Sequence, residues 1–177
     1  MKTTTLATLT LASTFLLSCT GEKTEVETNE TTSSGEDRIS VVFLNEEPAG
    51  AITVLEARAD ATPGETLVVA GKIAGVMNPF TDGYASVVLA DEALKTCDLI
   101  PGDECPTPWD ACCVAPEELK TQRMTIQIPG DDGLPVAQGL KGVNGLAEMD
   151  PVIVTGTVNG SSTKENLVLD LTGIYRK

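Results

Sequence analysis

The sequence PVIVTGTVNGSSTKENLVLDLTGIYRK, residues 151–177, decides the fold of this chain. Apolar residues alternate with polar ones on both sides of Asn159-Gly160, a pair typical of β-hairpin turns. Gly156 and Gly173 lie inside the two runs, where the strands of a small barrel must bend sharply. The segment is therefore predicted to form a hairpin of a strongly curved sheet.

Three earlier segments repeat this period of two, and each is predicted to be a strand: residues 66–73, 84–91 and 124–128. Between the third and fourth strands only residues 145–149 suit a single helical turn. The order of three strands, a short helix and two strands predicts an all-β domain, a small five-stranded OB-fold-like antiparallel barrel. The alternative is another small antiparallel barrel or sandwich.

A resemblance supports the barrel. The runs ETLVVAGKI (65–73), VIVTGTV (152–158) and LDLTGI (169–174) resemble the barrel strands of exported bacterial OB-fold domains. The resemblance implies a domain that binds its ligand on the face of the second and third strands and the loops around it. It implies no particular ligand, because one fold serves many functions.

The first residues are typical of an export signal. Residues 1–18 contain Lys2, an apolar run from Leu6 to Leu17 and no carboxylate, which predicts a cleaved signal peptide. Leu16-Leu17-Ser18-Cys19 resembles the lipobox of bacterial lipoproteins, although Leu17 departs from the usual small residue. The resemblance implies acylation of Cys19, a bilayer as partner, and attachment to the cell envelope. Thr20 after the cysteine favours the outer membrane, facing the periplasm. An ordinary secretory signal is the alternative, and it also predicts export.

Residues 19–38 are predicted to be a disordered acidic tether, since Val26 is their one strongly apolar residue. Residues 39–177 suffice for one domain. In it, residues 39–44 are predicted to be a short strand or the end of the tether, and residues 49–59 a short helix. The net charge of −14 argues against nucleic acid as a partner, because nucleic-acid affinity depends on Lys and Arg replacing counterions.

The long connection between the second and third strands, residues 92–123, holds four cysteines and the only tryptophan. Its core, Cys-Pro-Thr-Pro-Trp-Asp followed by a cysteine pair, resembles a stretch of uncharacterised exported bacterial proteins, which brings no activity with it. Connections of this length usually carry function or their own cross-links. We therefore take the insert as the candidate site.

Outside the cytoplasm four cysteines most often form two disulfides. Adjacent cysteines form a strained ring, because their Cα atoms are about 3.8 Å apart while disulfides prefer about 4.4 to 6.8 Å. The favoured prediction is that Cys97 and Cys105 each bond to one member of the Cys112-Cys113 pair. No cofactor is expected under this interpretation.

Two alternatives keep thiols reduced. Four thiolates suit Cu(I), Zn(II) or an iron-sulfur cluster, but the paired C-x-x-C spacing of common zinc sites is absent and the chain has no histidine. A redox dithiol at Cys112-Cys113 is the second alternative. Trp109 is predicted either to cap the core beneath the insert or, with Asp110, to contact a ligand.

The lack of histidine also removes the commonest general base, so no catalytic site is predicted. The sequence favours a membrane-tethered, non-enzymatic lipoprotein that acts as a binding or scaffold module through a disulfide-stapled recognition loop. Its partner is then an unknown envelope protein or small ligand. The alternative is a metal-handling or thiol-redox lipoprotein that uses the four cysteines.

Overall fold

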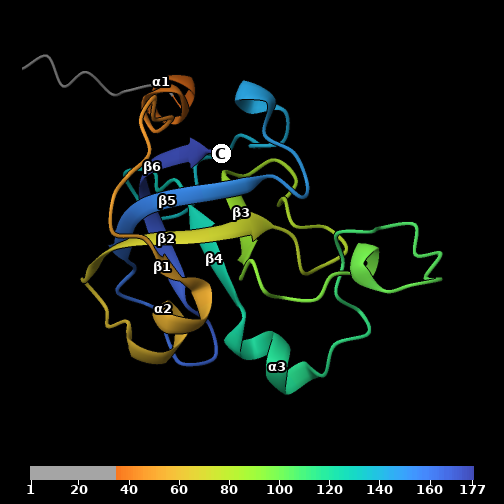
Figure 1. Cartoon of the computed structure of the whole chain (residues 1–177). Coiled ribbons are helices and arrows are strands. Elements are labelled where there is room, and N and C mark those ends of the chain that lie inside the picture. The colour runs from red at the N-terminus through yellow and green to blue at the C-terminus, as the bar shows by residue number, and fades with distance from the viewer. Residues whose placement is uncertain (1–34) are drawn as a thin grey trace, which may run out of the picture. The chain divides into compact units, whose positions relative to one another are not determined.

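A computed structural model describes residues 35–177, and its centre is a closed five-stranded barrel (Figure 1). Each barrel strand coincides with a predicted alternating segment to within two residues. The strands are β2 (Thr66–Ile73), β3 (Ser86–Ala90), β4 (Arg123–Gln127), β5 (Pro151–Val158) and β6 (Val168–Arg176). The predicted all-β barrel is therefore confirmed.

The strands follow one another around the barrel in the order β2-β3-β4-β6-β5, and β5 closes it by pairing with β2. This is the strand order of an OB-fold. The prediction of a purely antiparallel barrel is wrong at one pair, because β4 and β6 run parallel, with Ile126 beside Leu169. The strand order imposes that direction. All the other neighbouring pairs of the barrel are antiparallel, so β6, as the hairpin partner of β5, runs in the same direction as β4.

The strands β5 and β6 approach each other closely near the end of β5. The register between β5 and β6 shifts between Thr155 and Gly156, as expected at a β-bulge, which bends the strand. A Cβ atom built on Gly156 would meet the carbonyl oxygen of Asp170 and come within 2.9 Å of Leu169 Cγ. Only glycine lets β6 come this near.

The N-terminal boundary of the domain differs from the prediction. Gly35–Val41 form a helix, α1, so the last four residues assigned to the disordered tether are helical. Ile39 and Val42 are buried against the barrel, which explains why the chain is ordered here. Of the strand considered for residues 39–44, only a bridge between Phe43 and Ile174 is present. The signal peptide, Cys19 and the rest of the tether lie outside the described residues.

The predicted helix at residues 49–59 is present but shorter. A two-residue strand, β1 (Ile52–Thr53), pairs parallel with β2 and leads directly into α2 (Val54–Asp60). Thr53 and Glu56 form a capping box, in which each side chain accepts a hydrogen bond from the other residue's backbone N–H. The capping box explains why β1 ends at Thr53 and α2 begins at the next residue.

The turn expected at residues 145–149 lies slightly earlier, at η2 (Val143–Gly145), and it is not a regular helical turn, because Asn144 and Gly145 have positive φ. Met149 has a positive φ of 70°, which right-handed helical turns do not allow. The insert also contains a helix that was not predicted, α3 (Pro116–Thr121). Pro116 at its first position and two acidic residues in its first turn are ordinary helix-start signals.

The main core fills the barrel and is sensitive to single methyl groups. Ile126 of β4 is 1% exposed, whereas Val41 is 75% exposed. We expect Ile126→Val to lower the free energy of unfolding by about 0.5–1.5 kcal/mol, since the lost methyl leaves a small cavity. Urea denaturation measures the loss, and Val41→Ala, the surface control, should change it by less than about 0.5 kcal/mol.

Candidate thiol site

The insert leaves the barrel at the end of β3 and returns at the start of β4 (Figure 1). A backbone hydrogen bond of 2.8 Å from Asp91 to Gln122 closes its base. Farther out, the N–H of Cys97 donates to the carbonyl of Asp110 at 2.8 Å, and that of Asp98 donates to Pro108 at 3.0 Å. The two arms of the insert are therefore held side by side by their backbones.

A second small apolar cluster, separate from the main core of the barrel, joins the insert to residues at the ends of β2 and β3. It consists of the buried side chains of Ala74, Ala90, Leu94 and Ala111. Four partly buried residues pack against this cluster: Trp109, Val114, Leu119 and Met149. Little in the sequence indicated this cluster, because its eight residues come from four separate segments.

Trp109 packs half-buried against this second cluster, and its indole N–H donates to the carbonyl of Met77 at 2.9 Å. Asp110 is 9% exposed, and its carboxylate accepts the N–H of Ala111 at 2.7 Å. Both residues therefore help to shape the insert. Their contact with a ligand stays a prediction.

A buried lysine ties the start of the insert to the barrel. Lys72 of β2 donates from Nζ to the carbonyl of Leu94 at 2.8 Å and to the hydroxyl of Thr96 at 3.2 Å. The Thr96 hydroxyl donates in turn to Asp98 at 2.5 Å. Burial lowers the pKa of Lys72, while the negative charge of Asp98 opposes that shift. This contact was not predicted from the sequence, although a lysine next to Ile73 in an apolar strand was a visible signal.

We expect Lys72→Met to lower the free energy of unfolding by about 1–3 kcal/mol, because it leaves a buried carbonyl and a buried hydroxyl without their donor. Hydrogen exchange should increase at residues 94–98 more than in the barrel strands. The control Lys95→Met changes a neighbouring exposed lysine and should alter neither quantity. Equal effects of the two variants would contradict this role of Lys72.

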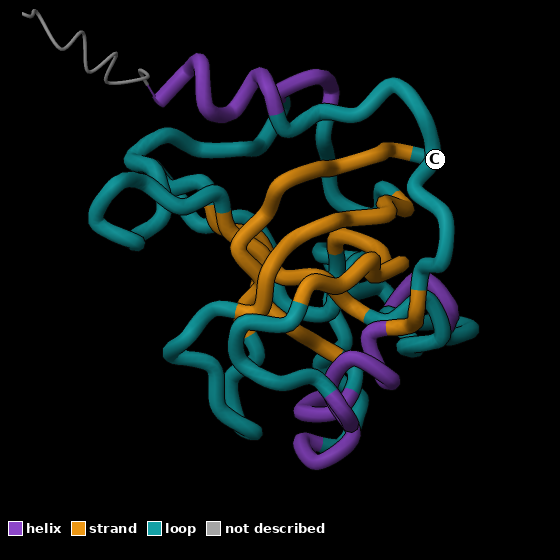
Figure 2. Tube along the Cα trace, turned by 90° about the vertical axis from the view of Figure 1, so that its left-hand side faces the viewer, coloured by secondary structure: helices purple, strands orange, loops and turns teal. Residues whose placement is uncertain are grey.

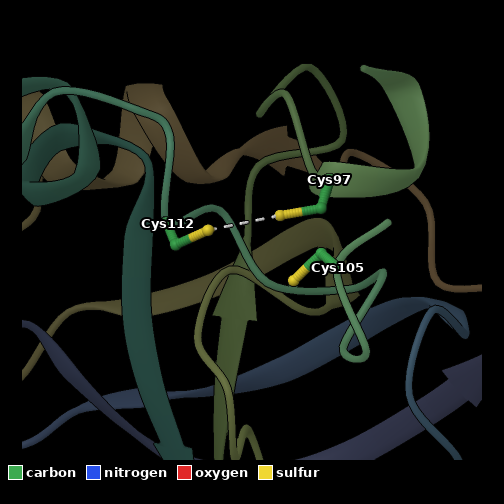
Figure 3. A group of neighbouring side chains, drawn as sticks. All are labelled: Cys97, Cys105 and Cys112. Carbon is green, nitrogen blue, oxygen red and sulfur yellow. Dashed lines mark hydrogen bonds between the residues drawn. The ribbon is translucent and has the colours of Figure 1, made fainter. Parts of the chain in front are cut away.

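Three of the four insert cysteines converge. The sulfur atoms of Cys97, Cys105 and Cys112 all lie within 4.8 Å of one another, and those of Cys97 and Cys112 are 3.6 Å apart (Figure 3). Cys97 starts the 3-10 helix η1 (Cys97–Leu99), and the other two lie on the returning arm. Cys97 is buried, Cys105 half-buried and Cys112 exposed, so the cluster opens to solvent on one side.

Cys113 stays at the edge of this group. Its sulfur is 3.9 Å from that of Cys112, but it does not belong to the set that meets around Cys97 and Cys105. Among residues 35–177 no two sulfur atoms are at bonding distance. The two predicted disulfides are therefore not present in this structure, and the pairing of the cysteines stays a prediction.

The three clustered thiols differ in acidity. Burial, followed by hydrogen bonds with the other two sulfurs, raises the pKa of Cys97 to about 12. Hydrogen bonds with the hydroxyl and the backbone of Thr107 lower the pKa of Cys105. For Cys112 the bond with Cys97 lowers the pKa, but the contact with Cys113 and burial outweigh it and raise the pKa. Cys105 is thus the most acidic thiol of the three.

The donor set of this cluster is sulfur alone. The chain has no histidine, and two nearby carboxylates are already engaged, Asp98 with Thr96 and Asp103 with the N–H of Cys105. Soft thiolates select Cu(I), Zn(II) or iron-sulfur clusters over hard cations such as Mg²⁺ and Ca²⁺. The three thiols can therefore hold one thiophilic ion.

The site lies on the connection between β3 and β4. Figure 2, turned by a quarter from Figure 1, shows the strands gathered into the barrel with helices only at its margins. None of the helices in the described part of the chain is both long and apolar enough to cross a bilayer. Loops fixed to a rigid barrel commonly carry binding residues.

The chain matches no known protein family and no curated protein sequence. A solved structure with a similar backbone is described as the hypothetical protein ygiW from E. coli. It shares 14% identity over 73% of this chain and 94% of its own, with a TM-score of 0.37. The OB-fold assignment therefore rests on strand order rather than on this likeness.

Proposed function

We propose that this chain is a non-enzymatic, membrane-tethered binding protein of the bacterial envelope, whose ligand is a thiophilic metal ion held by Cys97, Cys105 and Cys112. The observation that carries the proposal is the convergence of the three sulfurs within 4.8 Å. These residues are separated by 8 and 7 positions and come from both arms of the insert. Their meeting therefore depends on the folded loop rather than on a local motif.

The support of the loop is consistent with a binding role. Backbone hydrogen bonds, the second apolar cluster and Lys72 all hold the insert without any cross-link between cysteines. Ligands that are held in place before binding lose less freedom when the ion arrives, which increases affinity. The supporting contacts thus leave the sulfurs available for an ion.

Export and anchoring are supported by the sequence. The features of residues 1–18 and the lipobox-like Leu16-Leu17-Ser18-Cys19 favour a cleaved signal and an acylated Cys19. Several acyl chains on one residue anchor a protein firmly to a bilayer. The lipoprotein would face the periplasm, which is an oxidising compartment.

A second candidate function is a disulfide-stapled recognition module for an envelope protein or small ligand. The observation that favours it is that the thiols of Cys97 and Cys112 point toward each other at 3.6 Å (Figure 3). A change of side-chain rotamer would bring this pair toward bonding distance. The loop would then serve as a rigid surface instead of a metal ligand.

One experiment separates the two candidates. The full-length lipoprotein is purified from bacterial envelopes under anaerobic, non-reducing conditions, its free thiols are counted, and its metals are measured by elemental mass spectrometry. The proposal predicts close to one copper or zinc ion per chain and at least three thiols that react after the metal is removed. No metal together with no free thiol would overturn it in favour of the stapled module.

A further inference from the structure

We infer that the ion is Cu(I), bound in a three-coordinate site by the thiolates of Cys97, Cys105 and Cys112, with Cys113 outside the first coordination sphere. This inference rests on the proposed function and names the ion that the site selects. It depends on the number of ligands that the folded insert brings together.

The triangle of sulfurs has the size that a shared ion requires. A metal about 2.3 Å from three sulfurs in its plane holds them about 4 Å apart. The structure places the sulfurs of Cys97 and Cys112 at 3.6 Å and keeps all three pairs within 4.8 Å. A small adjustment of side chains therefore suffices to close the three ligands around one ion.

A fourth ligand is not provided. Cys113 approaches only Cys112, with which it shares a turn of the returning arm, and its sulfur is not in the group that meets around Cys97. The carboxylates of Asp98 and Asp103 accept hydrogen bonds within the insert, and the chain has no histidine. Among the described residues, three sulfurs are thus the group that the folded insert brings within reach of one ion.

Coordination number decides between the two common thiophilic ions. Structural Zn(II) sites are almost always four-coordinate and tetrahedral, so zinc here would need a water molecule or a rearranged Cys113. Cu(I) is a soft ion with a filled d shell, and it is satisfied by two or three thiolates. The three-sulfur group therefore suits Cu(I) better than Zn(II).

The exposure of the ligands fits an ion that enters from one side. Cys97 is buried at the back of the group, whereas Cys112 is exposed at the front. An ion can approach through Cys112 and then be enclosed by the deeper thiols. Replacing the Cys113 side chain leaves the three proposed ligands unchanged, so Cys113 is the natural control position.

The test uses the full-length protein under anaerobic conditions, with its thiols reduced and its metals removed. Cu(I), supplied as its acetonitrile complex, is titrated against the chelator bathocuproine disulfonate, and Zn(II) is titrated in parallel. We expect one Cu(I) per chain, three sulfur neighbours in the copper X-ray absorption spectrum, and no displacement by equimolar Zn(II).

Serine variants identify the ligands. Cys97→Ser, Cys105→Ser and Cys112→Ser should each weaken Cu(I) binding by more than about 100-fold, since loss of a direct ligand costs more than loss of an outer partner. Cys113→Ser should stay within about threefold of the wild type, well below that ligand-loss effect. Circular dichroism of each variant checks that the barrel is folded, and the absorption spectrum of the wild type tests the coordination number independently.

The outcomes separate this inference from the proposed function. Tight Zn(II) binding by four sulfurs, lost in Cys113→Ser, would overturn the Cu(I) inference and leave a metal-binding function in place. Failure of the reduced protein to bind either ion would overturn both. Unchanged Cu(I) binding in Cys97→Ser would overturn the assignment of the ligands.

Discussion

Replacing residues 91–122 by a two-residue Asn-Gly turn is expected to abolish metal binding completely while leaving a folded barrel. The physical reason is that β3 and β4 already pair up to Ala90 and Arg123, so a tight turn can join them directly. All four insert cysteines are removed with the insert. Elemental analysis should find no bound copper or zinc, and circular dichroism should retain the β spectrum.

The shortened chain must also compensate for lost contacts. Lys72 loses its partners Leu94 and Thr96, so the shortened protein should carry Lys72→Met as well. The matched control keeps the insert and changes its four cysteines to serine, which should likewise bind no metal. A shortened chain that still binds one ion per molecule would show that the site lies elsewhere. One that fails to unfold cooperatively would show that the insert belongs to the folding unit.

The second large effect is expected where β5 and β6 approach each other closely. Gly156→Ala should lower the free energy of unfolding by about 3 kcal/mol or more, because the added Cβ would overlap the backbone carbonyl of Asp170. Backbone atoms on a paired strand cannot move aside as the end of a flexible side chain can. Urea denaturation measures the change as a lower midpoint.

Gly160, in the β5–β6 turn, is the matched control. A Cβ atom there would meet nothing within 4 Å, so Gly160→Ala should change the free energy of unfolding by less than about 0.5 kcal/mol. Gly71→Ala offers a second test, since its Cβ would lie 2.5 Å from the carbonyl oxygen of Ala90. Equal stability of Gly156→Ala and Gly160→Ala would contradict the proposed role of the close approach.

The effect on metal binding and the effect on stability are expected to be independent, because the thiol site and Gly156 lie on different parts of the domain. Gly156 faces β6, whereas the cysteines lie on the connection between β3 and β4. A site on a loop can vary while the barrel that carries it stays the same. Gly156→Ala should therefore reduce the amount of folded protein without changing the metal affinity of the molecules that fold.

Some elements of the fold were missed because they depend on contacts between distant segments. The helix α1 is ordered by the burial of Ile39 and Val42 against a barrel whose strands extend from Thr66 to Arg176. The parallel pair of β4 and β6 follows from the strand order and leaves no mark in either strand's own pattern. Local alternation reports which face of a strand is buried and does not report its neighbour.

By itself the sequence determined the five barrel strands, the pairing of the last two as a hairpin and the place of the insert, because period two, turn residues and loop length are local properties. The tight turn expected at Asn159-Gly160 is instead the start of a longer connection between Val158 and Val168. The sequence also excluded histidine as a ligand of any metal site here, since the chain has none. Only the tertiary structure decided that Cys97, Cys105 and Cys112 meet while Cys113 stays outside. The reason is that their meeting depends on how two arms of one loop pack against Lys72 and a small apolar cluster, and spacing along the chain does not encode that packing.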